Sequence, residues 1–246
     1  MILHQYPGGD GLTSLSPPCV KIEMALRRIG AEHRVVVCRS SLEAKRVSPS
    51  GRLPVLELDG ERLFDSQVIL DELERRHPES DLFPREPRER TVDRLWEHYV
   101  NDNLYWHGVY MRWVAPETSA RMVSATFGRM PFYMRWLVRA TFLPSLRARA
   151  KGQGIAAKSP ESVVRGIERG FDMLEAGLDG GPFLQGRDRP GRGDLAGASL
   201  LAQLGFRDTM PDIARRLAAR PALVEHVRKV YDACRMDLPR WFRRER

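Results

Sequence analysis

Strand-forming sequence is confined to the first third of the chain, and this uneven distribution restricts the fold more than any other feature. Residues 2–6 form a short strand candidate, and residues 34–38 carry three consecutive valines, a β-branched run typical of a buried strand. Residues 55–58 and 62–64 flank Asp59 and Gly60, a pair that favours a tight hairpin. The first third of the chain therefore predicts a small sheet.

Two helices are expected between and after these strands. Ser16 followed by Pro17 is typical of a helix start, and Gly30 ends the apolar pattern, so a helix is predicted over residues 17–29. A second helix is predicted over residues 66–76, because a proline follows shortly after. The order β-α-β followed by β-β-α predicts a small mixed sheet covered by helices.

The rest of the chain is helical in pattern. Aromatic residues recur at spacings of three and four between residues 96 and 113, so they share one helical face. Another helix begins at Ser159, and further helices are predicted over residues 194–204 and 221–232. The proline-rich and charged stretch HPESDLFPREPRER separates the two patterns. It predicts a first domain over residues 1–80 and an all-helical domain over residues 88–246.

The composition excludes several classes of protein. Apolar residues make up 42% of the 246 residues and charged residues 29%, which is the balance of a globular protein. The N-terminal residues lack the pattern of a secretory signal, and no apolar run approaches the ~18 residues of a spanning helix. Three cysteines are too few for a disulfide framework. We therefore expect a cytoplasmic protein without a transmembrane segment.

The formal net charge of +8 raises the question of an acidic partner. The basic residues are spread along the chain, with denser groups over residues 135–151 and 240–246. No zinc-finger spacing, RNA-binding aromatic signature or glycine-rich phosphate loop accompanies them, so no nucleic-acid partner is expected. A solvated surface with a basic tail is the simplest interpretation, and an acidic ligand or an anionic membrane surface is the alternative. The six histidines show no metal-ligand spacing, so no metal is predicted.

Four separate stretches resemble the glutathione S-transferase superfamily. They are SPPCVKIEMAL, SGRLPVLELDG, FDSQVILDEL and PFLQGRDRPGRGDLAGASLLAQL, and they occur in the order and spacing of that superfamily. The resemblance implies an α/β thioredoxin-like N-terminal domain that binds glutathione, followed by an all-α C-terminal domain. The long insertion before Ser159 looks more like the metaxin and failed-axon-connections branch, whose members are less clearly catalytic.

The resemblance implies that glutathione is a co-substrate, with no further cofactor, and that Ser16 contacts its sulfur. An ordinary thiol, with a pKa of about 8.5, is only a few per cent ionised at neutral pH. A hydroxyl donor at a helix start would stabilise the thiolate, which makes Ser16 the candidate catalytic residue. Ser14 and Thr13 are alternatives, because the activating residue can lie earlier in the chain. Cys19 is another alternative, unless it is a buried hydrophobic residue, and a purely capping role for Ser16 is also open.

The same resemblance supplies the other glutathione contacts. Pro54 would follow a cis peptide bond, and the backbone of Leu53 would pair with the cysteinyl part of glutathione like an added strand. Asp65 and Ser66 open a helix whose amides would bind the γ-glutamyl carboxylate, while Asp65 would accept from the ligand ammonium group. Arg52 and Lys45 would be the candidates to meet the glycyl carboxylate, but a surface charge is the favoured interpretation of each. A simple pair of helix-capping residues is the alternative for Asp65 and Ser66.

Aromatic residues of the second domain are candidates for an acceptor-substrate pocket, although an aromatic stripe is more often part of a core. They are Tyr99, Trp106, Tyr110 and Trp113. Asp194 resembles the superfamily's helix-capping aspartate, but Gly191 stands where its serine or threonine partner is expected. Asp194 is therefore assigned a folding role.

These features predict a glutathione transferase that adds the glutathione thiolate to a small hydrophobic electrophile. A noncatalytic module that binds a protein or a membrane surface is the alternative, because residues 129–158 combine basic and aromatic residues. A homodimer is also expected, chiefly from the resemblance. The helix predicted over residues 66–76 adds a physical reason, since it carries more apolar residues than one narrow stripe needs: Val68, Ile69, Leu70 and Leu73.

Overall fold

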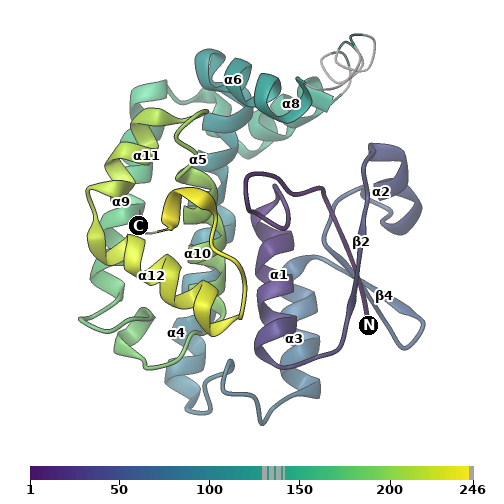
Figure 1. Cartoon of the computed structure of the whole chain (residues 1–246), viewed down its shortest axis with the longest axis vertical. Coiled ribbons are helices and arrows are strands. Elements are labelled where there is room, and N and C mark those ends of the chain that lie inside the picture. The colour runs from purple at the N-terminus through teal and green to yellow at the C-terminus, as the bar shows by residue number, and fades with distance from the viewer. Residues whose placement is uncertain (129–131, 133–135, 137–139, 141, 244–246) are drawn as a thin grey trace.

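The computed structural model describes residues 1–128, 132, 136, 140 and 142–243. Part of the basic segment singled out above, including Arg135 and Arg139, lies outside the described residues. The chain first forms a small sheet with flanking helices and then a helical domain, which is the predicted architecture (Figure 1). Its strands are β1 (Ile2–Gln5), β2 (Arg34–Val37), β3 (Val55–Leu58) and β4 (Glu61–Phe64).

The sheet has the strand order β2-β1-β3-β4, in which β1 is parallel to β2 and antiparallel to β3. β3 and β4 form the predicted hairpin, and Asp59 and Gly60 take the positive φ angles of 53° and 85° that a tight turn requires. The strand predicted over residues 34–38 forms as β2, but the prediction that this strand is buried is wrong. β2 is an edge strand, and Val37 keeps 38% of its surface exposed.

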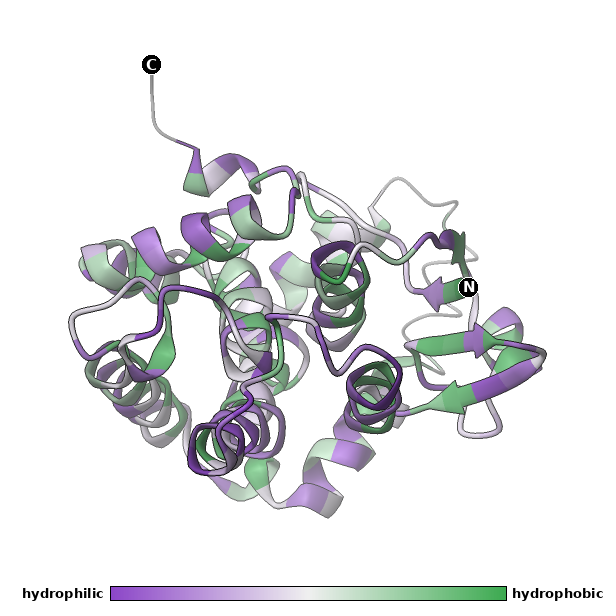
Figure 2. Ribbon diagram, turned by 90° about the horizontal axis from the view of Figure 1, so that it is seen from below, coloured by the Kyte–Doolittle hydropathy of each residue, from purple (hydrophilic) through white to green (hydrophobic). Residues whose placement is uncertain are grey.

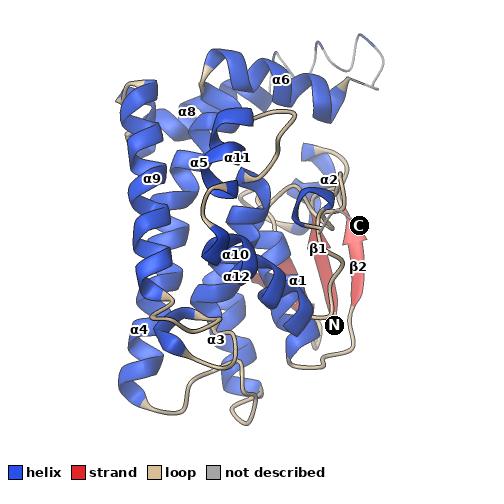
Figure 3. Cartoon of the chain, turned by 60° about the vertical axis from the view of Figure 1, so that its left-hand side comes forward, coloured by secondary structure: helices blue, strands red, loops and turns tan. Residues whose placement is uncertain are grey.

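Three helices belong to the first domain. α1 (Pro17–Arg28) and α3 (Ser66–Arg76) start and end close to the predicted positions. α2 (Ser41–Val47) was not expected from the polar sequence between β2 and β3. α1 and α3 lie between the sheet and the helical domain (Figures 1 and 3). The start of α1 is thereby held where the two domains meet.

The second domain is built from helices that pack their hydrophobic residues against one another. Hydrophilic residues lie on the outer sides of these helices (Figure 2). One continuous helical stretch runs from α4 (Pro87–His98) through Tyr99–Leu104 and α5 (Tyr105–Val109) to Tyr110–Val114, with two π-helical segments. The other described helices are α6 (Pro116–Phe127), α8 (Leu143–Gln153), α9 (Pro160–Gly177), α10 (Arg192–Leu204), α11 (Pro211–Ala218) and α12 (Pro221–Ala233).

Buried charges join the two domains where α1 and α3 meet α4 and α10. Lys21 of α1 is fully buried and its Nζ lies 2.6 Å from an oxygen of Glu97 in α4. Arg192 of α10 lies 2.7 Å from the other oxygen of Glu97 and 2.6 Å from Asp71 of α3. Lys21 and Arg192 therefore each have a carboxylate partner from another element. These pairs fix the position of α3 against the helical domain.

The start of α10 is capped by a residue from another helix. Asp93 of α4 accepts hydrogen bonds from the backbone N–H groups of Arg192 (2.9 Å) and Gly193 (3.0 Å). A Cβ atom at Gly191 would lie only 2.4 Å from the Asp93 carboxylate. Asp194 keeps its expected capping bond to the Gly191 N–H, at 2.7 Å. The missing serine or threonine at position 191 is thus explained, because Asp93 occupies its space and its capping role.

The apolar surplus of α3 does not call for a second subunit. Ile69, Leu70 and Leu73 are fully buried within the single chain, and only Val68 keeps half of its surface exposed. The physical reason given for a dimer is therefore wrong for these three residues, since the sequence alone could not show that the same chain covers them. The homodimer itself stays a prediction from the resemblance.

Candidate functional site

Ser16 stands at the junction between the loop after β1 and the first turn of α1. It occupies the N-cap position with extended backbone angles, but its side chain makes no capping hydrogen bond. Its backbone N–H donates to the hydroxyl of Ser14 at 3.2 Å, and Ser14 is itself fully buried. Ser16 is half-buried. Its hydroxyl makes no capping bond to the helix backbone and lies within hydrogen-bonding reach of the Cys19 thiol, from which it can rotate towards a ligand.

Cys19 lies in the first turn of α1, three residues after Ser16. It is fully buried, and burial raises the pKa of its thiol to about 11, although hydrogen bonds from Ser16 and Ser14 oppose the shift. A thiol with such a pKa stays protonated at neutral pH and is a poor nucleophile. These surroundings favour the interpretation of Cys19 as a buried hydrophobic residue.

Leu53 and Pro54 lie next to Cys19. The Leu53–Pro54 peptide bond is cis, as the resemblance implies. Leu53 packs in one small apolar cluster with Cys19 and Cys38, which places this segment against the first turn of α1. The backbone of Leu53 makes no backbone hydrogen bond with the described residues outside the sheet. Arg52 is exposed and forms no ion pair within the described part of the chain.

Asp65 and Ser66 begin α3 on another side of α1. Asp65 has a positive φ of 74° and its carboxylate accepts a hydrogen bond from the Gln67 N–H at 2.8 Å. It lies close enough to Lys21 for its negative charge to oppose the lowering of the Lys21 pKa, which burial causes. Ser66 is buried with 8% of its surface exposed. The segments around Ser16, Leu53 and Asp65 thus surround the N-terminal half of α1.

Three residues that were not predicted complete the surroundings. Tyr6, at the end of β1, donates a hydrogen bond from its hydroxyl to the carbonyl of Gly51 at 3.0 Å. Burial raises the pKa of Tyr6 to about 12, while the positive charge of Arg149 from α8 acts in the opposite direction. Tyr105 of α5 also lies near Tyr6. Tyr6 is the last residue of the strand predicted over residues 2–6, and this position was the available signal for it.

The four aromatic residues proposed for an acceptor pocket face other parts of the helical domain. Tyr110 and Trp113 are buried, and Trp113 packs edge-on against Phe142 at 5.5 Å between ring centroids. Tyr99 contacts Trp96 edge-on and lies near Arg169 of α9, and Trp106 is half-buried beside Tyr105. This packing favours the core role that the sequence left open.

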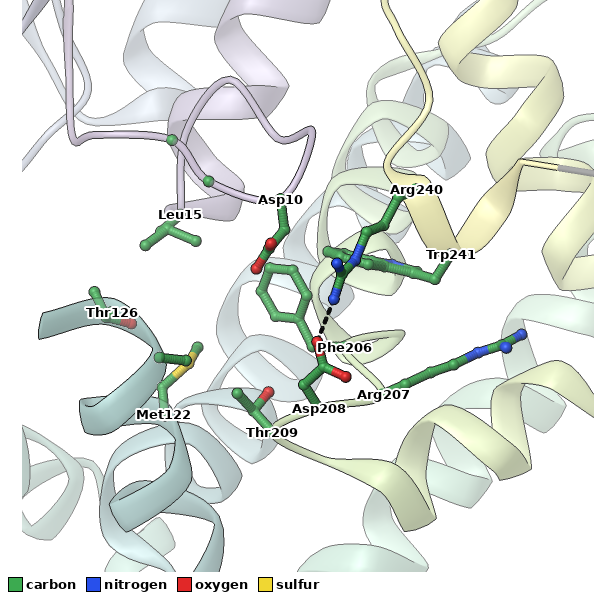
Figure 4. Close-up of a pocket in the computed structure, with 13 residues that line it drawn as sticks. Asp10, Leu15, Met122, Thr126, Phe206, Arg207, Asp208, Thr209, Arg240 and Trp241 are labelled. Carbon is green, nitrogen blue, oxygen red and sulfur yellow. Dashed lines mark hydrogen bonds and ion pairs between the residues drawn. The ribbon is translucent and has the colours of Figure 1, made fainter. Parts of the chain in front are cut away.

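A cavity of about 350 Å³ opens beside the loop that leads to Ser16 (Figure 4). Leu15, Met122 and Phe206 contribute apolar walls, and Trp241 packs edge-on against Phe206 at 4.3 Å. Its polar residues include Asp10 and Arg207 and an ion pair between Asp208 and Arg240. None of the four predicted aromatic residues lines this cavity.

No cluster of three or more histidine, cysteine or acidic side chains in the part that the structure describes is arranged to hold a metal ion. Within the same residues, no helix is both long and apolar enough to cross a membrane.

Known proteins share both the sequence pattern and the fold. Residues 17–118 match the family model of the glutathione S-transferase N-terminal domain. The crystal structure of the β-etherase LigF from Sphingobium superposes with a TM-score of 0.62 over 93% of this chain and 98% of that one, at 21% identity. A glutathione S-transferase from Methylobacillus flagellatus, solved with glutathione bound, gives 0.59 at 20% identity over 95% and 96% of the two chains.

The fold is that of a glutathione S-transferase. The resemblance seen in the sequence is therefore confirmed, together with the predicted fold class. Failed axon connections of Drosophila melanogaster is 27% identical over 249 residues, which cover 96% of this chain. Protein LigF is 33% identical over 113 residues, or 43% of this chain. The matched parts span 58% and 42% of those two proteins, so the chain corresponds to only part of their length.

Proposed function

We propose that the protein binds glutathione around the start of α1 and that Ser16 activates the glutathione thiol for addition to a small electrophile. The observation that carries this proposal is the state of the Ser16 hydroxyl, which stands at a helix start without capping the helix. A hydroxyl in this position can donate to a thiolate and so favour the ionised form. The buried Cys19 is too weakly acidic to take over this role.

The remaining contacts follow from the segments that surround α1. The backbone of Leu53, which has no other backbone partner among the described residues, would pair with the cysteinyl part of glutathione. The Ser66 hydroxyl and the amides at the start of α3 would bind the γ-glutamyl carboxylate, and Asp65 would accept from the ammonium group. Glutathione supplies its own thiol, so this reaction requires no catalytic cysteine.

The cavity beside Leu15 is the best-supported place for the electrophile. It has room for a small molecule and adjoins the residue that precedes Ser16. Its walls are apolar, but Asp10, Arg207 and the Asp208–Arg240 pair add charge. An acceptor with an apolar body and one polar group would suit both features. The three described cysteines are free and buried, which is in keeping with a reducing compartment such as the cytoplasm.

Calorimetry with glutathione tests the proposal directly. The wild-type protein should bind glutathione, and Ser66→Ala should weaken binding by about 1–3 kcal/mol because a ligand polar group loses its partner. Ser16→Ala should raise the pKa of the bound thiol while changing the affinity only modestly. Ser159→Ala is a matched control, because Ser159 caps α9 through the Ser162 N–H. An absence of binding at millimolar glutathione would refute the proposal.

A noncatalytic role at a membrane surface is the second candidate. Phe132 and Trp136 lie in the basic segment and keep 78% and 69% of their surfaces exposed, which is unusual for large aromatic residues. Co-sedimentation with anionic vesicles separates the two candidates. Vesicle binding that Phe132→Ser and Trp136→Ser abolish, together with no affinity for glutathione, would favour the second candidate.

A further inference from the structure

Arg112 is an enclosed cation without an acidic partner. It lies in the segment Tyr110–Val114 and keeps only 3% of its surface exposed. Its guanidinium donates to the carbonyls of Leu15 (3.2 Å) and Gly108 (3.3 Å) and to the side-chain oxygen of Gln203. All three acceptors are neutral, and no described carboxylate forms an ion pair with Arg112. Burying a charge without an oppositely charged partner costs free energy, unless the charge stabilises another group.

One nitrogen of Arg112 is left over. Nε and Nη1 make the three hydrogen bonds, while Nη2 has no acceptor among the described residues. The side chain thus keeps free donor capacity beside the loop that ends at Ser16.

The start of α1 is poorly equipped to hold an anion by itself. A helix N-terminus usually offers free N–H groups to a negative ligand. Here the first two helical residues are Pro17 and Pro18, which have no N–H. The next N–H, that of Cys19, already donates to the Ser16 carbonyl at 3.0 Å. A thiolate at Ser16 would find the hydroxyl but few backbone donors, so a further positive charge is needed.

The ionisable groups that surround this loop come from several elements. They are Tyr6 from β1, Cys19 from α1, Cys38 after β2, Tyr105 from α5 and Arg149 from α8. Burial raises the pKa of Tyr6 to about 12 and that of Cys19 to about 11, and it also raises the pKa of Cys38. These three groups stay neutral at pH 7 and cannot compensate Arg112. Arg149 is a second cation, but it is half-exposed and water screens its charge.

We propose that Arg112 is a positioning residue that holds the turn before Ser16 through the Leu15 carbonyl and keeps the thiol of bound glutathione ionised through its charge. This inference rests on the proposed glutathione binding. Arg112 donates to the carbonyl of Leu15, the residue before Ser16, and a positive charge near a thiol favours the thiolate. The proton released on binding passes to water. The bound thiolate in turn supplies the negative charge that Arg112 lacks in the protein alone.

Replacing the charge at constant size tests the inference. In Arg112→Met, the pKa of bound glutathione should rise by about one unit, as followed by the ultraviolet absorbance of the thiolate during a pH titration. The affinity for glutathione should change less than about threefold, because Arg112 is not assigned a contact with the rest of the ligand. The conjugation rate should fall about tenfold below the new pKa and return to the wild-type value above it. Arg112→Lys, which keeps the charge, should retain a lowered thiol pKa.

Two controls separate charge from structure. Gln203→Met removes one partner of Arg112 but leaves the charge, and Arg149→Met removes the exposed cation, so both should keep the wild-type thiol pKa. Circular dichroism checks that each variant is folded. A wild-type thiol pKa in Arg112→Met, or an equal rise in Gln203→Met or Arg112→Lys, would overturn the role of Arg112 while glutathione binding stands. A wild-type protein that does not bind glutathione would remove both proposals.

Discussion

The contact between the two domains contains two enclosed arginines with the same exposure of 3% and opposite surroundings. Arg192 lies among three carboxylates, those of Asp71, Glu74 and Glu97. Arg112 contacts only neutral oxygens. A compensated buried charge fixes the arrangement of the elements that share it, whereas an uncompensated charge is available to a ligand. The region around Arg192 therefore holds the two domains together, and the region around Arg112 is suited to act on the thiol of bound glutathione.

The largest effect is expected at the compensated arginine. Arg192→Met should lower the free energy of unfolding by about 3–5 kcal/mol, because it leaves the buried carboxylate of Glu97 with Lys21 as its single cation among the described residues and removes the link to α3. Urea denaturation measures the change. Arg215→Met is the matched control, since Arg215 is 75% exposed in its pair with Asp212 and should cost less than about 1 kcal/mol. Equal losses in both variants would contradict the structural role of Arg192.

The sequence contained the local elements of this architecture but not the two charged regions. Ser16 with Pro17 and Asp59 with Gly60 act on their immediate neighbours, so a helix start and a hairpin could be read directly. Even α2 had such a signal, because Ser40 and Glu43 have the spacing of a capping box, and the Ser40 hydroxyl accepts from the Glu43 N–H at 3.2 Å.

Long-range contacts leave no such pattern. Arg112 and Leu15 are 97 positions apart, and Asp93 and Gly193 are 100 positions apart. The partners of a buried charge depend on how helices pack, and nothing in the residues next to Arg112 distinguishes it from an arginine on the surface. For the same reason the aromatic stripe from Tyr99 to Trp113 could be read as a pocket or as a core, since spacing alone does not show which elements cover a helical face.

A second variant tests whether the compensated region depends on Asp93 as the external cap of α10. Gly191→Ser should lower the free energy of unfolding by about 1–3 kcal/mol, because its Cβ would lie 2.4 Å from the Asp93 carboxylate. In an Asp93→Ala background the same substitution should become neutral or stabilising, because only the flexible end of Arg187, whose Nη1 lies 2.5 Å from the same Cβ position, must then move for the serine to cap the helix. A double-mutant cycle by urea denaturation measures this change of sign. A constant effect of Gly191→Ser in both backgrounds would show that Asp93 does not occupy the serine position.

The pH dependence of stability tests the burial of the two carboxylates that cap α10. Desolvation raises the pKa values of Asp93 and Asp194 to about 7, although backbone N–H groups oppose the shifts. An unfolded aspartate has a pKa of about 3.9, so the stabilisation is complete below pH 4 and is lost as the pH rises through 7. Asn mimics the protonated side chain, so the destabilisation by Asp93→Asn should shrink by about 2–3 kcal/mol between pH 5 and pH 8.

The comparison with Asp93→Asn is needed because other groups titrate in the same range. Burial lowers the pKa of His226 to about 4, which makes the wild-type protein gain stability as the pH rises from 4 towards 6.5. This gain is common to both proteins and cancels in the difference between them. A destabilisation by Asp93→Asn that grows with pH would contradict the raised pKa of Asp93.

The smallest effect on stability is expected at the uncompensated arginine. Arg112→Met should change the free energy of unfolding of the ligand-free protein by no more than about 1 kcal/mol. Two contributions oppose each other here. Removing a buried charge that forms no ion pair with the described residues relieves its desolvation. Against this, the carbonyl of Leu15 and the buried side-chain oxygen of Gln203 each lose a partner, at a cost of about 1 kcal/mol each. Urea denaturation of Arg112→Met beside Arg192→Met measures the contrast. A loss of 3 kcal/mol or more at Arg112 would make both arginines structural, and the charge beside Ser16 would then need no ligand to explain it.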